Sequence, residues 1–319
     1  MDNPYTNTTF WGFLITLLKR VTAFGLQKLS LQDLVSDEIQ LLVLIPIALS
    51  AALVGTFLIL KKMTMLANSL SHTLLVGIVL AFFLLPKPEL GLFNLTHMLI
   101  AAGLSALLTV FCTEFLIKIV GIQEDASIGV VFTSLFALGL ILLSLFTKNT
   151  HFGTEVVMGN VDLLALNDAL IPWIVFGINA ILFFLFFKEY TITTFDPELS
   201  KTLGFKPKLF SYLLMIQTAL TCIASFRAVG VIMVLAFLTG PILTARLLTH
   251  RLKRLVGIAC ILSLFSSLFG VALARHIFSV YGLPLSTGGL IVSLIGCFFL
   301  LALFWNLLRD RLFHSFKSV

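Results

Sequence analysis

The feature that most constrains this chain is a series of long apolar runs that recurs along almost its whole length. A run of about 20 apolar residues can cross the hydrocarbon core of a bilayer as an α-helix. Runs of this length exclude the much shorter strands of a membrane barrel, and only helices or closed barrels satisfy their backbone in lipid. We expect nine membrane-spanning helices, at about residues 39–60, 70–86, 97–117, 127–147, 168–187, 209–226, 228–246, 256–274 and 286–308.

Composition favours a membrane protein over a soluble one. Of the 319 residues, 59% are hydrophobic and only 11% are charged, whereas soluble domains are about a quarter charged. The four cysteines all fall inside apolar runs without C-x-x-C spacing, which is typical of small buried side chains. We therefore predict an all-α fold, a polytopic membrane helical bundle of about nine transmembrane helices.

The distribution of Lys and Arg predicts how the chain is oriented. If the break at Lys61 and Lys62 is cytoplasmic, 14 of the 21 Lys and Arg residues lie in inside breaks. This bias places the C-terminus inside and, with nine spans, the N-terminus outside. The net charge of +6 is explained by these short basic breaks, so no nucleic-acid partner is expected.

Three regions follow from this pattern. Residues 1–38 are predicted to be an N-terminal amphipathic extension, because apolar side chains recur there at helical spacing around Lys19 and Arg20. A tenth crossing in this region is the alternative. Residues 39–308 form the transmembrane domain, and residues 309–319 form a cytoplasmic C-terminal tail.

A short helix is predicted at about residues 196–204, within an inside break. Asp196 suits the N-cap and Pro197 suits the first helical position. Glu198 places negative charge in the first turn, and Gly204 ends the helix. Such a helix is too small to be a domain, but it has the right size to dock into a groove on a partner.

One polar cluster enters the second predicted span. Asn68 and His72 are four residues apart and share a helix face. An imidazole nitrogen is a common ligand for Zn, Mn or Fe, and an amide oxygen suits the harder ions of that range. Ionisable groups inside a membrane are costly and therefore functional candidates. The alternative is a histidine that is hydrogen-bonded within the bundle.

The sequence contains no motif for ATP hydrolysis. The dipeptide Gly-Lys does not occur, so there is no P-loop, and G-x-G-x-x-G, H-E-x-x-H and G-x-S-x-G are also missing. We expect no catalytic residues and no cofactor bound by this chain. If ATP drives its function, the ATP is bound and hydrolysed by a partner chain.

Four stretches together resemble a known family. The sequence is similar to the permease subunits of bacterial ABC importers for Mn, Zn and Fe ions, the metal branch related to the vitamin B12 and siderophore permeases. The likeness runs from about residue 39 to residue 308. It rests on LKKMTMLANSLSHTLLVG (60–77), QEDASIGVVFTSLFALG (123–139), FDPELSKTLGFKPKLF (195–210) and VGVIMVLAFLTGPILTARLL (229–248), in family order and at family spacing.

The resemblance implies a type II ABC importer permease fold and a role for two sets of residues. Asn68 and His72 match the aspartate and histidine of the family's D-A-L-S-H, which face the metal path. An amide therefore stands where the family has a carboxylate. The family's coupling helix, which the ATPase grips, matches the short capped helix. Its contact residues here are Asp196, Pro197, Glu198, Leu203 and Gly204.

The resemblance also implies partners and a location. They are ABC ATPase subunits, a periplasmic or lipoprotein metal-binding protein, a second permease subunit of the same or a different kind, and the bilayer of the bacterial inner membrane. A permease for a metal chelate such as a siderophore or haem is one alternative, and a proton- or sodium-driven secondary transporter is another. An intramembrane enzyme is not expected, because it would need catalytic groups that converge at bilayer depth, and the candidate residues here are scattered along the chain. The sequence does not choose among Mn, Zn and Fe, because their ligand sets overlap.

Overall fold

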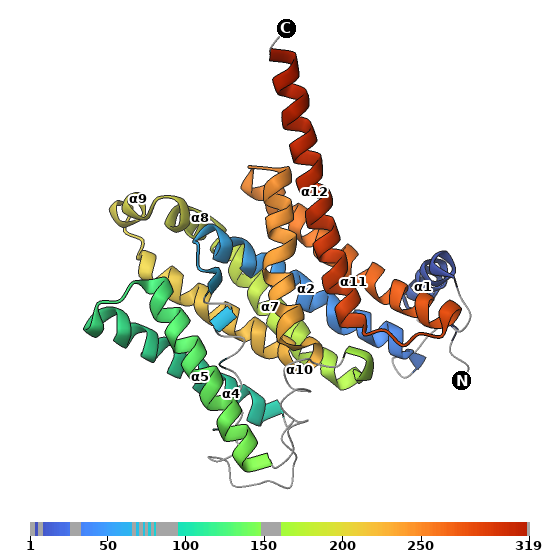
Figure 1. Ribbon diagram of the computed structural model, residues 1–319, viewed down its shortest axis with the longest axis horizontal. Helices are drawn as coiled ribbons and strands as arrows, with labels where there is room; N and C mark the ends of the chain where they lie inside the picture. Colours follow the sequence, from blue (N-terminus) through green and yellow to red (C-terminus); the bar gives the residue numbers. More distant parts are fainter. Residues whose placement is uncertain are drawn as a thin grey trace. The chain divides into compact units, whose positions relative to one another are not determined.

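The computed structural model describes residues 4–5, 9–25, 33–65, 68–69, 73, 76–77, 80, 95–147 and 161–317. Nearly all of these residues are helical (Figure 1). The chain divides into two compact units. Unit 1 consists of Met1–Thr56, Asn160–Gly177 and Ala236–Val319, and unit 2 of Phe57–Gly159 and Ile178–Leu235.

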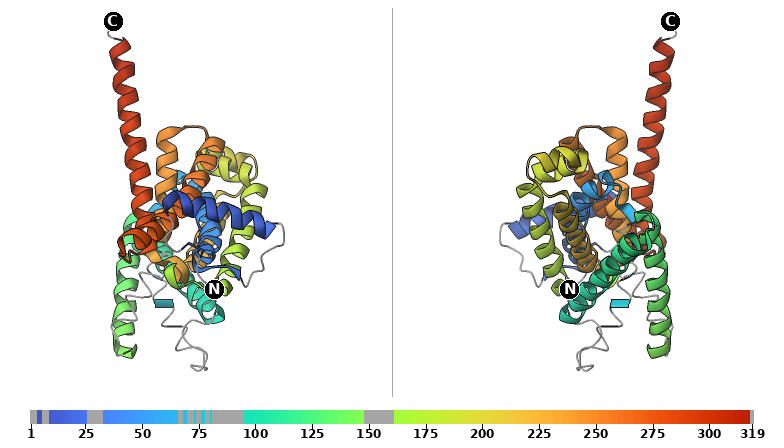
Figure 2. Two further views of the ribbon diagram at one scale, coloured as in Figure 1. Left: turned by 90° about the vertical axis from the view of Figure 1, so that its right-hand side faces the viewer. Right: turned by 90° about the vertical axis from the view of Figure 1, so that its left-hand side faces the viewer.

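The described elements follow the order of the predicted spans. They are α1 (Phe10–Gly25), α2 (Ser36–Leu60), α4 (Leu95–Phe115), the π-helical turn η3 (Leu116–Val120), α5 (Glu124–Thr147), the 3₁₀ turns η4 (Val161–Leu163) and η5 (Leu166–Ala169), α7 (Leu170–Leu185), α8 (Phe187–Phe195), α9 (Pro197–Thr202), α10 (Pro207–Leu248), α11 (Leu252–Tyr281) and α12 (Thr287–Lys317). Helix α12 continues into the predicted C-terminal tail as one long helix (Figure 2).

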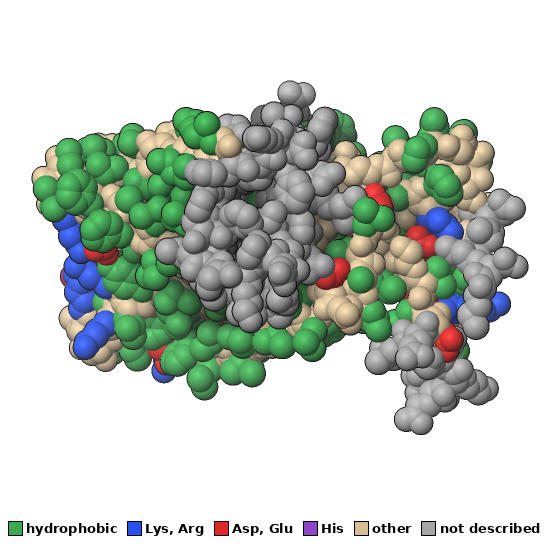
Figure 3. All heavy atoms as spheres, turned by 90° about the horizontal axis from the view of Figure 1, so that it is seen from below, with side chains coloured by type: hydrophobic (Ala, Val, Ile, Leu, Met, Phe, Trp, Pro, Cys, Tyr) green, Lys and Arg blue, Asp and Glu red, His purple; other side chains and the backbone are tan. Residues whose placement is uncertain are grey.

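Within the described residues, seven helical stretches are long and apolar enough to cross a membrane. An eighth predicted span coincides with α5, whose apolar part is the shorter Ala126–Leu142. The predicted span at 70–86 lies mostly outside the described residues. The multi-pass helical bundle is therefore confirmed, whereas the count of nine spans stays a prediction. Much of the described surface drawn in Figure 3 is hydrophobic, as expected for a lipid-facing protein.

Helix α10 contains two of these stretches, 207–226 and 228–248. They meet near Gly230, whose φ of 73° and ψ of 172° are not helical. A positive φ of this kind is accessible to glycine because it has no Cβ. The sequence predicts this boundary to within a few residues, but it does not identify Gly230 as the residue that breaks the helix.

Close helix packing in unit 1 depends on two glycines that face α12. A Cβ added at Gly240 or at Gly270 would lie 2.2 Å from the side chain of Ile295 or Ile291, respectively. The two isoleucines are buried and four residues apart, so they lie on one face of α12. Small residues allow such close approach between helices that gain little from hydrophobic burial in lipid.

The N-terminal segment contacts the rest of unit 1 through apolar packing and through an ion pair. Phe13 of α1 is fully buried, and the ring of Phe10 lies 5.8 Å from that of Phe269 in α11. The opposite face of α1 exposes large apolar side chains, among them Trp11 and Leu18. The predicted N-terminal helix is therefore present, and one of its faces packs on the bundle.

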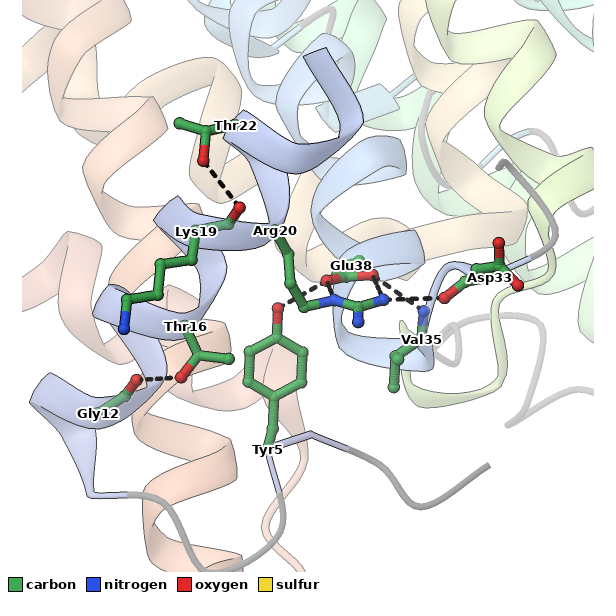
Figure 4. Close-up of polar contacts among 9 residues, drawn as sticks. All are labelled: Tyr5, Gly12, Thr16, Lys19, Arg20, Thr22, Asp33, Val35 and Glu38. Carbon is green, nitrogen blue, oxygen red and sulfur yellow. Dashed lines mark hydrogen bonds and ion pairs between the residues drawn. The ribbon is translucent and has the colours of Figure 1, made fainter. Parts of the chain in front are cut away.

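A carboxylate at the start of α2 gathers the polar groups of this segment (Figure 4). The Glu38 carboxylate accepts hydrogen bonds from Tyr5 Oη at 2.7 Å, from Arg20 Nε at 2.5 Å and from the Val35 backbone N–H at 3.1 Å. Arg20 Nη2 also donates to the Asp33 carbonyl oxygen at 2.9 Å. Hydrogen bonding to Glu38 raises the pKa of the Arg20 guanidinium. We call this cluster the Glu38 network.

Candidate functional site

The segment that holds the predicted metal-path residues is described only in part. Asn68 is helical and half-buried, whereas His72 lies outside the described residues. Ser69 is buried, and its hydroxyl has no hydrogen-bond partner within the described parts of the chain. Thr73 is also buried, and its hydroxyl oxygen lies 2.9 Å from that of Thr109 in α4. This contact places Thr73, five residues after Asn68, against α4.

The face of α4 that meets this segment carries a stripe of hydroxyl groups. Ser105, Thr109 and Thr113 are spaced four residues apart, and all three are buried. Thr109 and Thr113 each donate to the carbonyl oxygen four residues earlier, at 2.7 Å. The stripe thus presents neutral oxygen atoms, which suit weak contacts to a hard or borderline cation.

A second stripe of polar side chains lies on α10 within unit 2. Gln217, Thr221 and Ser225 are again four residues apart and buried. Tyr190 Oη of α8 donates to Gln217 Oε1 at 2.6 Å, and Asn179 Nδ2 of α7 donates to Thr221 Oγ1 at 2.8 Å. Buried polar groups are costly unless they are hydrogen-bonded, so this network joins α7, α8 and α10.

Neither stripe was predicted from the sequence. A signal was available, because polar residues at positions i, i+4 and i+8 inside an apolar run lie along one helix face. Each residue type alone is compatible with ordinary packing, so only the repeat is informative. Among the described residues, no group of three or more His, Cys, Asp or Glu side chains could hold a metal ion. The described side chains of the two stripes carry hydroxyl and amide groups.

The capped helix predicted from the sequence is confirmed as α9. Asp196 Oδ1 accepts a hydrogen bond from the Leu199 backbone N–H at 2.9 Å, and Pro197 occupies the first helical position. At the other end, Gly204 has a φ of 83°, and its N–H donates to the Lys201 carbonyl oxygen at 3.0 Å. The next N–H, that of Phe205, donates to the Ser200 carbonyl at 2.9 Å, which completes a Schellman motif.

The outer face of α9 is both charged and apolar. Glu198 and Lys201 form an exposed ion pair at 2.8 Å. Leu199 and Leu203 are 48% and 54% exposed. Apolar side chains that stay exposed beside charged ones are typical of a surface that contacts a partner.

Comparison with known proteins identifies the family. Residues 38–306 match the ABC 3 transport family. The chain belongs to this family. A probable metal transport system membrane protein of Chlamydia muridarum is 38% identical to it over 299 residues, which is 93% of each chain. The manganese transport system membrane protein MntD of Bacillus subtilis is 37% identical over 244 residues, 70% of this chain and 78% of that protein.

A solved structure supports the fold of this ABC 3 transport family member. PsaBC from Streptococcus pneumoniae, in complex with a Fab, superposes with a TM-score of 0.71 at 27% identity, covering 85% of this chain and 92% of that chain. The resemblance seen in the sequence is thus confirmed. Both polar stripes and α9 lie inside the matched range, whereas α1 and most of the Glu38 network lie before it.

Proposed function

We propose that this chain is the transmembrane subunit of an ATP-binding-cassette importer that carries a divalent transition-metal ion, Mn, Zn or Fe, into a bacterial cell. The observation that carries this proposal is the match of residues 38–306 to the ABC 3 transport family. A relative named for manganese transport adds support for a metal-ion cargo. The seven described stretches of spanning length place the chain in a membrane, and we assign it to the cytoplasmic membrane.

Asn68 and His72 are the proposed contacts of the ion on its path. The contact between Thr73 and Thr109 supports a place for this segment beside the hydroxyl stripe of α4. An amide and hydroxyls carry no charge, so they hold a divalent cation less tightly than carboxylates do. Weak, successive contacts favour transport because a site that binds too well does not release its ion.

Helix α9 is the proposed point at which ATP hydrolysis on a partner chain acts on this subunit. Asp196, Pro197 and Gly204 define the two ends of the helix. Glu198 and Leu203 present a charge and an apolar side chain on its exposed surface. A rigid, capped helix transmits the movement of the ATPase better than an unstructured loop does.

The remaining partners complete the cycle. A periplasmic or lipoprotein metal-binding protein delivers the ion to the outer face, and a second permease subunit closes the pore. Two ATPase subunits then switch the pore between outward and inward access. The chain itself acts as a non-catalytic subunit.

The test is metal uptake into vesicles that contain this chain with its ATPase and binding protein. We expect ATP-dependent uptake of Mn, Zn or Fe as the free ion, with uptake reduced by His72→Ala. The matched control is His250→Ala, because His250 is exposed and lies outside the spans. Uptake that needs a proton gradient and not ATP would contradict the proposal. If a siderophore or haem competes with uptake and free ions do not, the cargo is a metal chelate and not the free ion.

A further inference from the structure

A cavity of about 640 Å³ opens in unit 2 where several helices end. Its lining comes from the turn after α2, the last turns of α4 with η3, the second turn of α5, the end of α8, the first residue of α9 and the start of α10. The positive-inside bias predicts that these ends face the cytoplasm. The cavity therefore lies at the level of the inner lipid headgroups.

Positive charge dominates this cavity. Its lining includes Lys61, Lys62, Lys118 and Lys208 and, among the side chains that the structure describes, a single carboxylate, that of Glu114. Glu114 is already engaged by the Lys118 ammonium and by Tyr212 Oη. The other three lysines have no carboxylate within ion-pair distance among the described residues. Around the lysines the cavity attracts an anion and repels a metal cation, whereas Thr109 and Thr113 of the hydroxyl stripe line its α4 side.

Lys61 shows that this charge is partly removed from water. Its side chain is half-buried, and its ammonium donates a hydrogen bond to Ser211 Oγ at 3.1 Å. An ammonium has three N–H groups to satisfy. Burial lowers the pKa of Lys61 to about 8. A bound anion would supply the partner that a buried charge requires.

Lys62 is held in an unfavourable backbone conformation. Its φ is 61°, in the left-handed region. The Met63 N–H donates to the Leu58 carbonyl at 2.9 Å, and the Lys62 N–H donates to the Ile59 carbonyl at 3.0 Å. This is a Schellman motif with lysine at the position that glycine usually occupies. A strained residue retained where glycine fits better points to a use for its side chain.

The rest of the lining combines hydroxyl groups with apolar side chains, and the apolar side chains bear on the class of anion. Val110, Ile117 and Met215 line the same cavity as the lysines. We propose that this cavity binds the phosphate headgroup of an anionic phospholipid from the inner leaflet, with the lysines around the phosphate. The apolar side chains then contact the acyl chains. Inorganic phosphate shares the headgroup chemistry, but it gains nothing from the apolar side.

Pro197, the first residue of α9, lines this cavity too. A bound headgroup would therefore touch the bundle and the start of α9 together. The inner-leaflet location rests on the orientation in the proposed function, whereas binding itself does not. A binding measurement on the purified chain can therefore fail or succeed independently of transport.

The experiment measures retention of phosphatidylglycerol by the full chain in detergent, by native mass spectrometry, with phosphatidylcholine as the neutral comparison. Lys62 and Lys208 are both exposed, so Lys62→Gln/Lys208→Gln should fold. We expect phosphatidylglycerol affinity to fall roughly 10- to 50-fold for the two lost charges. The matched control is Lys253→Gln/Arg254→Gln, which removes two exposed charges outside the cavity and should change affinity less than about twofold.

A second variant separates binding from folding. Lys62→Gly removes the charge and relieves the left-handed strain, so we expect an equal or higher thermal midpoint with weaker phosphatidylglycerol binding. Equal losses in the cavity and control variants would overturn the proposal, because binding would then follow net charge alone. Displacement of the lipid by millimolar inorganic phosphate would also overturn it in favour of a free-anion site. Unchanged lipid binding with weaker capture of the ATPase subunit would assign the lysines to an acidic protein partner instead.

Discussion

The Glu38 network of unit 1 and the lysine cavity of unit 2 both bring charged side chains together at the ends of helices. They differ in whether each charge has a partner of opposite sign. In the network, one carboxylate accepts from a guanidinium, a phenol and a backbone N–H. In the cavity, four lysines accompany a single described carboxylate, which pairs with Lys118 alone. The network holds the N-terminal segment onto the start of α2, whereas the cavity retains charge that nothing in the described chain balances.

This difference separates structural charge from charge available to a ligand. A buried ion pair is costly to break because the remaining partner stays buried without compensation. A cluster of like charges destabilises the empty fold through self-repulsion, and a bound ligand of opposite sign relieves that repulsion. We therefore expect substitutions in the network to lower stability, and substitutions in the cavity to affect binding while leaving stability equal or higher.

The largest effect is expected from Glu38→Gln. The substitution keeps the shape but removes the charge that faces Arg20, and we expect a loss of about 3 kcal/mol in the free energy of unfolding. The readout is the thermal midpoint in detergent. Glu198→Gln is the control, because that ion pair is exposed and is worth less than about 1 kcal/mol. Equal losses of stability in the two variants would contradict the view that the Glu38 network contributes more to stability than an exposed ion pair does.

Packing in the same unit gives the next effect. Gly270→Val places atoms where Ile291 already lies, 2.2 Å from the added Cβ, and overpacking of this kind costs about 1–3 kcal/mol. Gly257 lies on the same helix and has no atom within 4 Å of an added Cβ. Gly257→Val should therefore leave the thermal midpoint within a few degrees of the native value. A stable Gly270→Val protein would contradict the close α11–α12 contact.

The smallest effect is a dependence of stability on pH through Lys61. Burial lowers its pKa from 10.5 to about 8, so the folded chain binds fewer protons than the unfolded chain between these values. Stability should therefore rise with pH in this window, with the full cost of the buried charge below pH 8. Lys61→Met should lack this rise, whereas Lys253→Met should keep it. The measurement is the thermal midpoint of lipid-depleted protein below pH 8 and near pH 10.5.

The sequence predicts the parts of the structure that depend on local chemistry. Apolar runs predict the helices, and the Asp196 cap, Pro197 and Gly204 predict α9, because each acts within a few residues. The Glu38 network and the cavity were not predicted, since Arg20 and Glu38 come from separate elements and the lysines meet only when three chain segments fold together. The position of the helix break at Gly230 was not predicted either, because the backbone angles of a single glycine cannot be read from the sequence. The role of His72 remains a prediction.

The most direct test of the account measures ATP hydrolysis and metal uptake in the same vesicles, for the native complex and for a chain that lacks residues 196–204. The account holds that this chain is the non-catalytic half of an ATP-driven importer and that α9 connects the two halves. It predicts that the deleted chain still inserts in the membrane but that uptake is lost, even where the ATPase continues to hydrolyse ATP. Uptake that survives the deletion would contradict the coupling role of α9.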